Sequence, residues 1–549
     1  MTPAEQLAAK QLAVVYERCR GFRTRKDLTL KDQAHLKKTF TGFDGKEYPL
    51  KVRYYQIQGA LHLFLMRRFL LGDDTGLGKT LSSIIGLCLV WSLEPERKAV
   101  VFTTKSSVDQ WAGEFSKFTK GVKVIVCKGT PTQRQRARAL FESSEGPAVF
   151  IIGYRGAVQD ISDMQDWSGQ VLILDEAAAF KNPKTQVHQV CRHLASQADR
   201  VWALTATLIK NHLMEGFGVY QVVMPGIFIH PTTEKPMSYN QFMIYYAIVR
   251  MQSIPRSNRQ IPVIIGYSPE KIQEFKDVID PYFLGRPKHE VASELPALIS
   301  RVVEVDLSPE QEAKYKEALD GVLEIGQGDD SQIRPTDHLT AITYCQQIVN
   351  DLELLGIEAP SPKIETLIEM LTEGDFEDEK VIIFSRFRKM IDILMPILKT
   401  KKIPAVRVTG SENEAQRAAA MAAFQNPDDP TRVCCITAAG SEAINLQAAK
   451  ALICFDTPWS AGDFLQLVGR MIRIGSEHDR CYVVHLVARG TRRKTVDHRV
   501  MEVLGKKMVL VEAVLGKRLK GEGDNVPIAA ENEISDLFRA LRQDAKEDE

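Results

Sequence analysis

The chain has 549 residues, with 71 Lys and Arg against 70 Asp and Glu and a formal net charge of +1. At roughly 150 residues per domain, this length predicts two to four domains. Hydrophobic residues make up 44% and charged residues 26%, which excludes wholesale disorder. The charge balance excludes a polybasic protein of the histone kind, although it leaves local basic grooves open.

The cysteines and the lengths of the apolar runs indicate in which cellular compartment the protein is expected. The nine cysteines include no C-x-x-C spacing, so a structural zinc site has no support, and most lie in apolar runs that predict buried thiols. Residues 1–30 lack the apolar run of a signal peptide, and no run approaches the roughly 20 residues of a membrane span. We expect a soluble intracellular protein without membrane contact, in a reducing cytoplasm.

The two ends of the chain carry opposite charge. Residues 1–70 contain 14 Lys and Arg but six Asp and Glu, whereas residues 521–549 contain three basic and nine acidic residues. The basic end is either a solvated helical face or a contact with nucleic-acid backbone. The acidic end predicts a short helix with a frayed tail. Both ends are also candidates for binding a protein partner.

Between these ends, short apolar runs alternate with helical patterns. Continuous Val, Ile and Leu runs without alternation are typical of strands that are buried on both faces of a parallel sheet. Two sets therefore predict two doubly wound α/β domains, whereas residues 212–360 lack this rhythm and read as mainly helical. The first set is at 98–104, 122–129, 148–154, 170–177 and 200–207, and the second is at 380–387, 404–410, 432–440, 451–456 and 481–487.

The segment FLLGDDTGLGKT (69–80) predicts a phosphate-binding loop. Gly76 and Gly78 let successive backbone N–H groups converge on phosphate oxygens, and the helix that follows adds its own unpaired donors. Lys79 can reach the β- and γ-phosphates, and the Thr80 hydroxyl can ligate Mg²⁺. The strict G-x-x-x-x-G-K-[ST] pattern is not met, because Asp73 stands at its first glycine.

A pair of carboxylates completes the candidate nucleotide site. Asp175 and Glu176 end the apolar run VLILDEA (171–177). An Asp at a strand end near a phosphate-binding loop can hold Mg²⁺, and the adjacent Glu can orient and polarise the attacking water. Together the two half-motifs predict nucleotide hydrolysis.

Two arginines far along the chain add a second candidate element. Arg470 and Arg473 are three residues apart, so a helix presents both on one side. Facing a γ-phosphate, their guanidinium groups can stabilise the charge that spreads over its oxygens. Because they lie in the other predicted α/β domain from Lys79, we expect ATP to be sandwiched between two lobes. The alternative is a pair of surface arginines in salt bridges.

With these residues in place, the chain resembles the Swi/Snf-type branch of superfamily 2 helicases and translocases, over about residues 50–515. Three positions depart from the family pattern, because Ala178, Leu208 and Ser476 stand where His, Pro and Gln are usual. The matching segments, in the family's order, are RYYQIQGA (53–60), GDDTGLGKT (72–80), VFTTKSSVDQWAGEF (101–115), DEAAAFKN (175–182), LTATLIKN (204–211), AAGSEAINLQAA (438–449) and QLVGRMIRIGS (466–476).

The resemblance implies further roles. It places Gln56 at the adenine edge, adds Gly440 and Gln466 to the nucleotide-binding residues, and makes Thr205 and Thr207 the coupling motif. Trp111 and Trp459 remain open as either core anchors or nucleic-acid contacts. The implied nucleic-acid contacts are Lys105, Ser106, Lys181, Asn211, Ser441, Asn445 and Trp459.

The resemblance also implies an architecture of two RecA-like lobes, each a doubly wound parallel sheet, with helical insertions. We predict four parts: a basic N-terminal helical segment at 1–46, lobe 1 with a helical protrusion at 47–294, lobe 2 with a helical insertion and a C-terminal brace helix at 295–515, and an acidic tail at 516–549.

The implied function is an ATP- and Mg²⁺-dependent translocase that moves along double-stranded DNA without sequence specificity and remodels bound proteins or branched DNA. A strand-separating RNA or DNA helicase is the first alternative. A nucleotide-binding scaffold without motor activity is the second. Because the sequence shows no recognisable histone-reading or zinc module, we expect the cytoplasm of a bacterial or phage-infected cell, with the nucleus left open.

Overall fold

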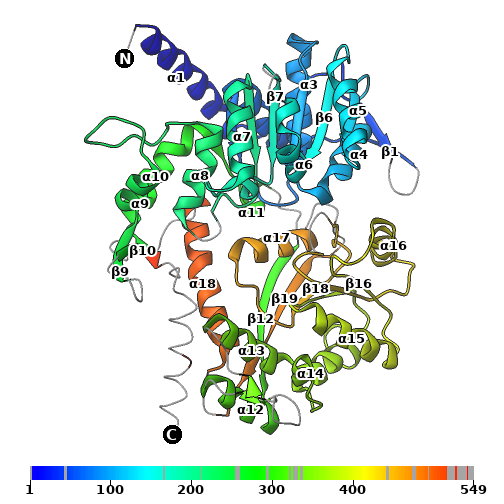
Figure 1. The fold of residues 1–549 in the computed structure, drawn as a ribbon. Helices are drawn as coiled ribbons and strands as arrows, with labels where there is room; N and C mark the ends of the chain where they lie inside the picture. The colour runs from blue at the N-terminus through cyan, green and yellow to red at the C-terminus, as the bar shows by residue number, and fades with distance from the viewer. Residues whose placement is uncertain are drawn as a thin grey trace. The chain divides into compact units, whose positions relative to one another are not determined.

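The computed structural model divides the chain into two compact units, each built around one large sheet (Figure 1). The first unit consists mainly of Met1–Ala247 and Ser268–Ser293, and the second mainly of Ile248–Tyr267 and Glu294–Glu512. The residues that the structure describes are 3–41, 46–164, 167, 169–209, 212–253, 260–291, 296–320, 323–324, 332–333, 338–440, 444–472, 476, 478–491, 494–515, 526–527 and 541.

The sheet of the first unit has seven strands in the order β11-β3-β8-β7-β4-β6-β5, and all of its pairings are parallel. All five strands predicted between residues 98 and 207 are confirmed. The strands are β3 Arg68–Leu71, β4 Ala99–Thr103, β5 Lys123–Cys127, β6 Ala148–Gly153, β7 Val171–Asp175, β8 Arg200–Leu204 and β11 Phe283–Leu284.

Helices α2, α3 and α4 pack against one another beside this sheet, and α6, α7 and α8 form a second packed group. Local signals set their ends. Thr130 caps α5 by accepting a hydrogen bond from the Gln133 backbone N–H, and Pro131 starts the helix. The helices of this unit are α1 Pro3–Arg23, α2 Tyr54–Met66, α3 Lys79–Leu93, α4 Val108–Phe118, α5 Pro131–Glu142, α6 Tyr154–Gln159, α7 Gln186–Gln197, α8 Leu213–Val223, α9 Tyr239–Tyr246, α10 Pro269–Ile279 and α11 Lys288–Val291.

The sheet of the second unit has six strands in the order β12-β19-β18-β15-β17-β16, again with only parallel pairings. All five strands predicted after residue 380 are confirmed. The strands are β12 Ala297–Asp306, β15 Val381–Phe384, β16 Ala405–Val408, β17 Val433–Ile436, β18 Ala451–Cys454 and β19 Arg480–Arg489, and the helices are α12 Pro309–Asp320, α13 His338–Asn350, α14 Pro362–Thr372, α15 Arg388–Thr400, α16 Glu414–Gln425, α17 Ala461–Met471 and α18 Val496–Leu515.

Both faces of the second sheet are buried, as the unbroken apolar runs predict. Ile383 and Ile453 pack into one apolar cluster, whereas their chain neighbours Ile382 and Leu452 pack into another. Successive side chains of a strand point to opposite faces, so two clusters mean that helices cover the sheet on both sides. Together the two sheets form the pair of doubly wound, RecA-like lobes that the sequence predicts.

The description of residues 212–360 as mainly helical is only partly right. This stretch contains helices, but it also contains β9 Ile248–Ser253 and β10 Gln260–Tyr267, which pair antiparallel, and the ten-residue strand β12. β12 lies at the edge of its sheet, and most of its side chains are exposed or half-buried. Its sequence therefore lacks the continuous apolar run that marks the other strands.

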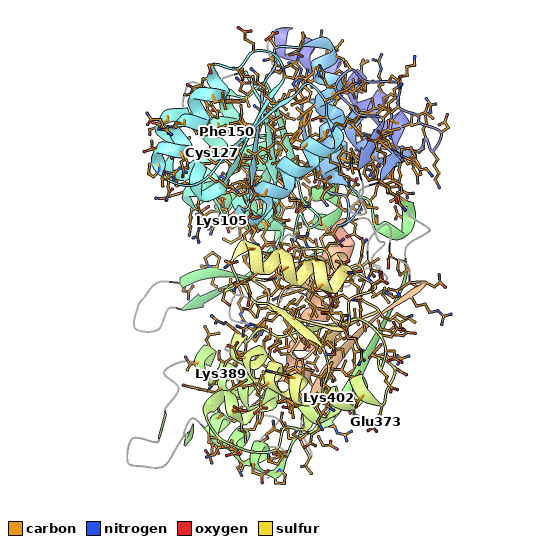
Figure 2. All side chains as sticks on the ribbon, turned by 90° about the vertical axis from the view of Figure 1, so that its right-hand side faces the viewer. Lys105, Cys127, Phe150, Glu373, Lys389 and Lys402 are labelled. Carbon is orange, nitrogen blue, oxygen red and sulfur yellow. The ribbon has the colours of Figure 1, made fainter. Side chains whose placement is uncertain are left out.

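The nine cysteines are all buried, as the apolar runs around most of them predict, and none forms a disulfide. Cys127 and Phe150 lie in the interior of the first unit (Figure 2). Of the predicted acidic tail at 516–549, only residues 526–527 and 541 are described, so the four predicted domain boundaries stay a prediction. Within the described part of the chain, no helix is long and apolar enough to cross a membrane.

Candidate functional site

The predicted phosphate-binding loop connects β3 to α3. Gly76 and Gly78 have φ angles of 85° and 82°, in the left-handed region that favours glycine, and Lys79 and Thr80 begin α3. A Cβ atom on Gly78 would lie 2.4 Å from Gln56 Nε2. The backbone angle therefore favours glycine at position 78, immediately before the helix N-terminus, and a larger residue there would displace the Gln56 amide.

Gln56 lies against this loop. Its side chain is buried, and its Nε2 donates a hydrogen bond to the Leu77 carbonyl oxygen at 3.2 Å, while its Oε1 accepts one from the Arg53 backbone N–H at 3.0 Å. The structure thus brings Gln56 against the phosphate-binding loop. Its contact with adenine stays a prediction.

The Lys79 ammonium donates to two carbonyl oxygens of its own loop, those of Asp73 at 2.6 Å and Asp74 at 3.3 Å. Burial lowers the pKa of Lys79 below its ordinary value, and the charges of Asp73, Asp74, Glu176 and Asp175 oppose that shift. The lysine and the predicted carboxylate pair therefore lie close enough to act on one another electrostatically.

Asp175 is the last residue of β7, and one of its two carboxylate oxygens accepts hydrogen bonds from neighbouring side chains. Its Oδ2 accepts hydrogen bonds from Thr103 Oγ1 at 2.9 Å and from Trp111 Nε1 at 2.7 Å. Trp111 is 2% exposed, so the structure resolves its two interpretations in favour of a buried residue. The Tyr154 hydroxyl donates to the Asp175 carbonyl oxygen at 2.6 Å, which also fixes the backbone.

Glu176 has a left-handed backbone, with φ 55° and ψ 68°. A residue with a Cβ atom adopts this region only at a cost of about 1–3 kcal/mol, and such residues cluster at functional sites. The turn directs the chain away from β7 immediately after Asp175.

The predicted coupling motif follows β8, the strand that lies between β3 and β7. Thr205 and Thr207 are buried, and Thr205 Oγ1 accepts the Thr207 backbone N–H at 3.1 Å. The Thr205 backbone N–H donates to the Leu71 carbonyl oxygen at 3.1 Å, directly before the phosphate-binding loop. The motif is therefore physically joined to the loop, and its coupling role stays a prediction.

The predicted nucleic-acid contacts of the first unit differ in accessibility. Lys105 is exposed and begins the short 3-10 helix Lys105–Ser107, and Ser106 belongs to the same turn (Figure 2). Lys181 instead donates to the buried carboxylate of Glu215 at 2.5 Å. Asn211 lies outside the described residues.

In the second unit, Gln466 and Arg470 lie one turn apart on α17, and both are half-buried. Arg473, the other predicted arginine, lies outside the described residues. α17 follows β18 along the chain. α17 ends at Met471 and Ile472 has an extended backbone, so the prediction that one helix presents both arginines is wrong. The contact of Arg470 with a phosphate stays a prediction.

Gly440 fills a tight position in the second unit. A Cβ atom there would lie 1.7 Å from the Val408 carbonyl oxygen, so packing alone requires glycine. The Asn445 carbonyl oxygen accepts a hydrogen bond from Gln425 Nε2 at 2.7 Å, and Ser441 lies outside the described residues. The structure therefore leaves the ligand roles of these residues as predictions.

Trp459 lies beside the ends of β15 and β18. The Arg386 guanidinium group stands over its ring at 5.4 Å, and Lys507 of α18 donates to its carbonyl oxygen at 3.1 Å. The indole Nε1 is buried without a hydrogen-bond partner among the described residues. These contacts make Trp459 at least partly a structural residue.

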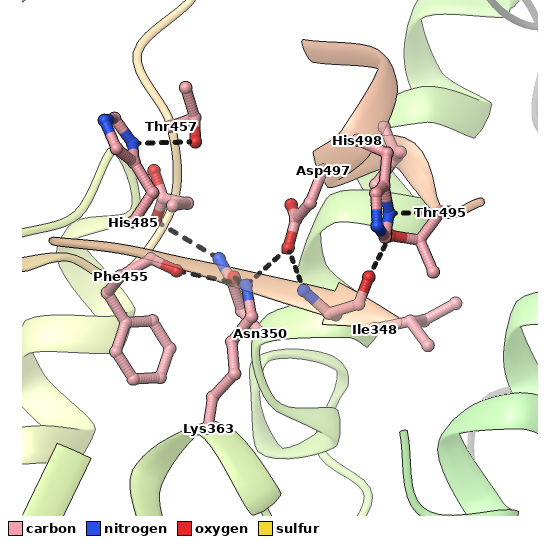
Figure 3. Close-up of polar contacts among 12 residues, drawn as sticks. Ile348, Asn350, Lys363, Phe455, Thr457, His485, Thr495, Asp497 and His498 are labelled. Carbon is pink, nitrogen blue, oxygen red and sulfur yellow. Dashed lines mark hydrogen bonds and ion pairs between the residues drawn. The ribbon is translucent and has the colours of Figure 1, made fainter. Parts of the chain in front are cut away.

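A buried ionic network supports this region (Figure 3). The Lys363 ammonium donates to Asp497 Oδ2 at 2.6 Å, to Asn350 Oδ1 at 3.0 Å and to the Phe455 carbonyl oxygen at 3.1 Å. Asn350 in turn donates to Asp456 Oδ2 at 3.2 Å, and burial raises the pKa of Asp456. The network joins the first turn of α18 to the ends of β15 and β18.

The sequence predicts neither the hydrogen bonds of Thr103 and Trp111 to Asp175 nor the ion pair of Arg286 with Asp73. Thr103 and Trp111 lie 72 and 64 residues from Asp175, and Arg286 lies 213 residues from Asp73. No motif spacing links residues so far apart. Only the three-dimensional pairing of β11 beside β3 brings Arg286 to the loop.

The comparisons with known proteins agree with this geometry. The SNF2-related domain matches residues 55–354, and the helicase conserved C-terminal domain matches residues 362–475. A chromodomain-helicase-DNA-binding protein 1-like from Danio rerio is 26% identical over 83% of this chain and 43% of its own length. An uncharacterised ATP-dependent helicase from Mycoplasma genitalium is 25% identical over 81% of this chain and 40% of its own.

Among solved structures, the SWI2/SNF2 ATPase core of Sulfolobus solfataricus in complex with dsDNA is 23% identical, with a TM-score of 0.39, over 86% of this chain and 98% of that one. The chain spans less than half the length of both curated relatives described above. The SNF2-related model alone covers more than half of the 549 residues. The chain therefore belongs to the SNF2-related family of superfamily 2, in which this domain is followed by a helicase conserved C-terminal domain.

Proposed function

We propose that the chain is a nucleic-acid-stimulated ATPase that translocates along double-stranded DNA. The observation that carries this proposal is that the phosphate-binding loop with Lys79 follows β3 and that Asp175 and Glu176 stand at the end of β7, so all three lie at the same edge of one parallel sheet. The family membership and the relatives named for helicase and DNA-binding activity support it.

The residues present fit a Mg²⁺ ion bound with the triphosphate. Among the described residues, both side-chain hydrogen bonds to the Asp175 carboxylate end on Oδ2, which leaves Oδ1 for the metal or its water. Thr80 supplies the second protein oxygen from the first turn of α3. Bound there, Mg²⁺ neutralises charge on the β- and γ-phosphate oxygens.

The protein's own groups then carry out the remaining steps. The loop backbone and the N-terminus of α3 receive the phosphates, and the Lys79 ammonium exchanges the Asp73 and Asp74 carbonyl oxygens for phosphate oxygens. Glu176 orients and polarises the attacking water. Arg470 and Arg473 stabilise the γ-phosphate in the transition state, and release of the products allows the two units to separate and advance.

The test compares ATP hydrolysis in the presence of duplex DNA, single-stranded DNA and RNA, with triplex displacement and strand unwinding measured in parallel. We expect duplex DNA to stimulate hydrolysis, the third strand to be displaced, and the duplex to stay paired. Stimulation by RNA alone, or unwinding, would favour a strand-separating helicase. No stimulation by any of the three would favour a nucleotide-binding scaffold.

Two variants assign the chemistry. Lys79→Ala should abolish hydrolysis, because no other group occupies its position in the loop. Glu176→Gln should bind ATP and fail to hydrolyse it, because the amide has lost the negative charge that polarises the water. Equal hydrolysis by the wild type and Glu176→Gln would remove Glu176 from this role.

A further inference from the structure

A buried ion pair stands at the start of the phosphate-binding loop. Asp73, at the position where the strict loop pattern has its first glycine, is 1% exposed, and Arg286 is 8% exposed. Arg286 donates from Nε to Asp73 Oδ1 at 2.8 Å and from its terminal nitrogen to Oδ2. The pair is bidentate, which fixes the direction of the carboxylate as well as its position.

The backbone on either side of Asp73 is tied to the same segment. The Gly72 N–H donates to the Leu284 carbonyl oxygen at 2.7 Å, and the Asp74 N–H donates to the Arg286 carbonyl oxygen at 3.1 Å. These bonds continue the parallel pairing of β11 with β3 into the loop. Three successive loop residues are therefore held by Leu284 and Arg286.

Arg286 is itself held from the opposite direction. Its remaining nitrogen donates to Gln58 Oε1 at 2.5 Å. The buried Gln58 amide donates in turn to the carbonyl oxygens of Phe22, Arg23 and Arg25 at 2.8–3.2 Å, at the end of α1. The guanidinium group is thus clamped between the loop and the amide, so little freedom remains in its orientation.

The residue held by this ion pair, Asp73, also contacts Lys79 through its backbone. The Asp73 carbonyl oxygen accepts the 2.6 Å hydrogen bond from Lys79 Nζ. A rotation of the Asp73 backbone would move this oxygen and the carboxylate together. Because a buried carboxylate without its partner is strongly disfavoured, the ion pair resists that rotation.

We propose that Arg286 is a positioning residue for ATP binding. It holds the Asp73 carboxylate and, through its own carbonyl oxygen, the Asp74 backbone, so that the loop keeps the conformation that receives phosphate. Arg286 contacts neither the lysine nor, in this proposal, the nucleotide. This inference rests on the proposed ATP hydrolysis at the same loop.

The test compares Arg286→Gln with Arg200→Gln. Arg200 is a matched control, because it is also a buried arginine of the first unit and donates to Glu94 Oε1 at 2.9 Å and to the Phe64 carbonyl oxygen at 2.8 Å. It starts β8, at the opposite end of that strand from Thr205. KM for ATP and kcat are measured at saturating duplex DNA, and Kd for ADP is measured by calorimetry.

For Arg286→Gln we expect KM for ATP and Kd for ADP to rise about tenfold, with a much smaller change in kcat. Arg286→Lys should recover part of this loss, because its ammonium can still reach one carboxylate oxygen. If an arginine only stabilises the fold, its replacement lowers the amount of folded enzyme, which reduces the maximal rate and leaves KM unchanged. For Arg200→Gln we expect this lower maximal rate with an unchanged KM.

Unchanged KM and Kd in folded Arg286→Gln would overturn the inference, as would an equal rise in Arg200→Gln. If Arg286→Gln does not fold, the double variant Asp73→Asn/Arg286→Gln is used instead, because it removes both buried charges. KM for ATP and Kd for ADP are then measured on the double variant. A wild-type chain that neither binds nor hydrolyses ATP would defeat the proposed function itself. An active wild type with insensitive Arg286 variants would defeat only this inference.

Discussion

Trp111 shows how one side chain can serve packing and chemistry together. Its ring is buried in the core of the first unit, and its Nε1 donates to the Asp175 oxygen that faces away from the proposed metal. We expect Trp111→Phe to keep most of the packing and lose this bond. Loss of a group that orients a metal ligand typically lowers metal affinity or activity 10- to 100-fold. The half-saturating Mg²⁺ concentration for hydrolysis should therefore rise by about tenfold.

Trp202→Phe is the matched control for this measurement. Trp202 is fully buried in the same unit, and its Nε1 makes no hydrogen bond within the described residues. Its replacement removes the same atoms from the core without touching Asp175. If both variants shifted the Mg²⁺ dependence equally, the effect would come from packing, and the proposed role of Trp111 would be wrong.

The left-handed backbone of Glu176 makes a second prediction at this scale. Alanine and glutamate both meet the steric cost of φ 55°, whereas glycine does not. Glu176→Gly should therefore be about 1 kcal/mol more stable than Glu176→Ala in urea unfolding, although both lose hydrolysis. The opposite order would mean that the turn relaxes when the glutamate side chain is removed.

At the scale of the elements, Gly440 lies where the chain after β17 crosses the end of β16. The nearest atom to an added Cβ is a backbone oxygen, at 1.7 Å, so the clash cannot be relieved by a side-chain rotation. Overpacking of this kind costs about 1–3 kcal/mol, and we expect Gly440→Ala to lower the free energy of unfolding by that amount.

At Gly505, replacement by alanine should raise the free energy of unfolding rather than lower it. This glycine lies on the exposed side of α18, with no atom within 4 Å of an added Cβ. Alanine should stabilise the helix there by about 0.5–1 kcal/mol. Equal effects of Gly440→Ala and Gly505→Ala in thermal unfolding would contradict the packing argument for Gly440.

The elements that could be predicted from the sequence are those with a continuous local signal. β7 and β15 are short apolar runs with both faces buried, so composition alone reveals them. β11 has two residues, and β12 is a largely exposed edge strand, so neither produces such a run. β11 nevertheless carries Arg286 to the loop, which explains why the supporting residues of the site were missed.

The same division holds within the site. Lys79 and Asp175 stand in short motifs beside apolar runs, and these motifs indicate phosphate and metal binding. The hydrogen bonds of Thr103 and Trp111 to Asp175 instead depend on how β4 and α4 are placed beside β7 in the folded chain. Cellular location and the domain boundaries have no local chemical signal of this kind, and both stay predictions.

At the scale of the whole molecule, the proposal that residues of both units act on one ATP makes a specific kinetic prediction. Lys79, Asp175 and Glu176, which we propose to bind ATP and its metal, belong to the first unit, whereas Arg470 belongs to the second. An arginine that acts on the transition state contributes about 10³–10⁵ to turnover. Arg470→Ala should therefore lower kcat by at least about 10³ while Kd for ATP changes little.

Arg388→Ala tests the alternative that Arg470 is an ordinary surface arginine. Arg388 lies on α15 of the same unit and is exposed, and its one ion pair with a described residue is a long one, to Asp392 at 3.7 Å. Surface pairs of this kind contribute about 0–1 kcal/mol, so hydrolysis should be unaffected. If Arg470→Ala weakened ATP binding and left turnover intact, the second unit would contribute to nucleotide affinity rather than to the chemical step. Movement along DNA could then not be driven by an arginine that engages only during hydrolysis.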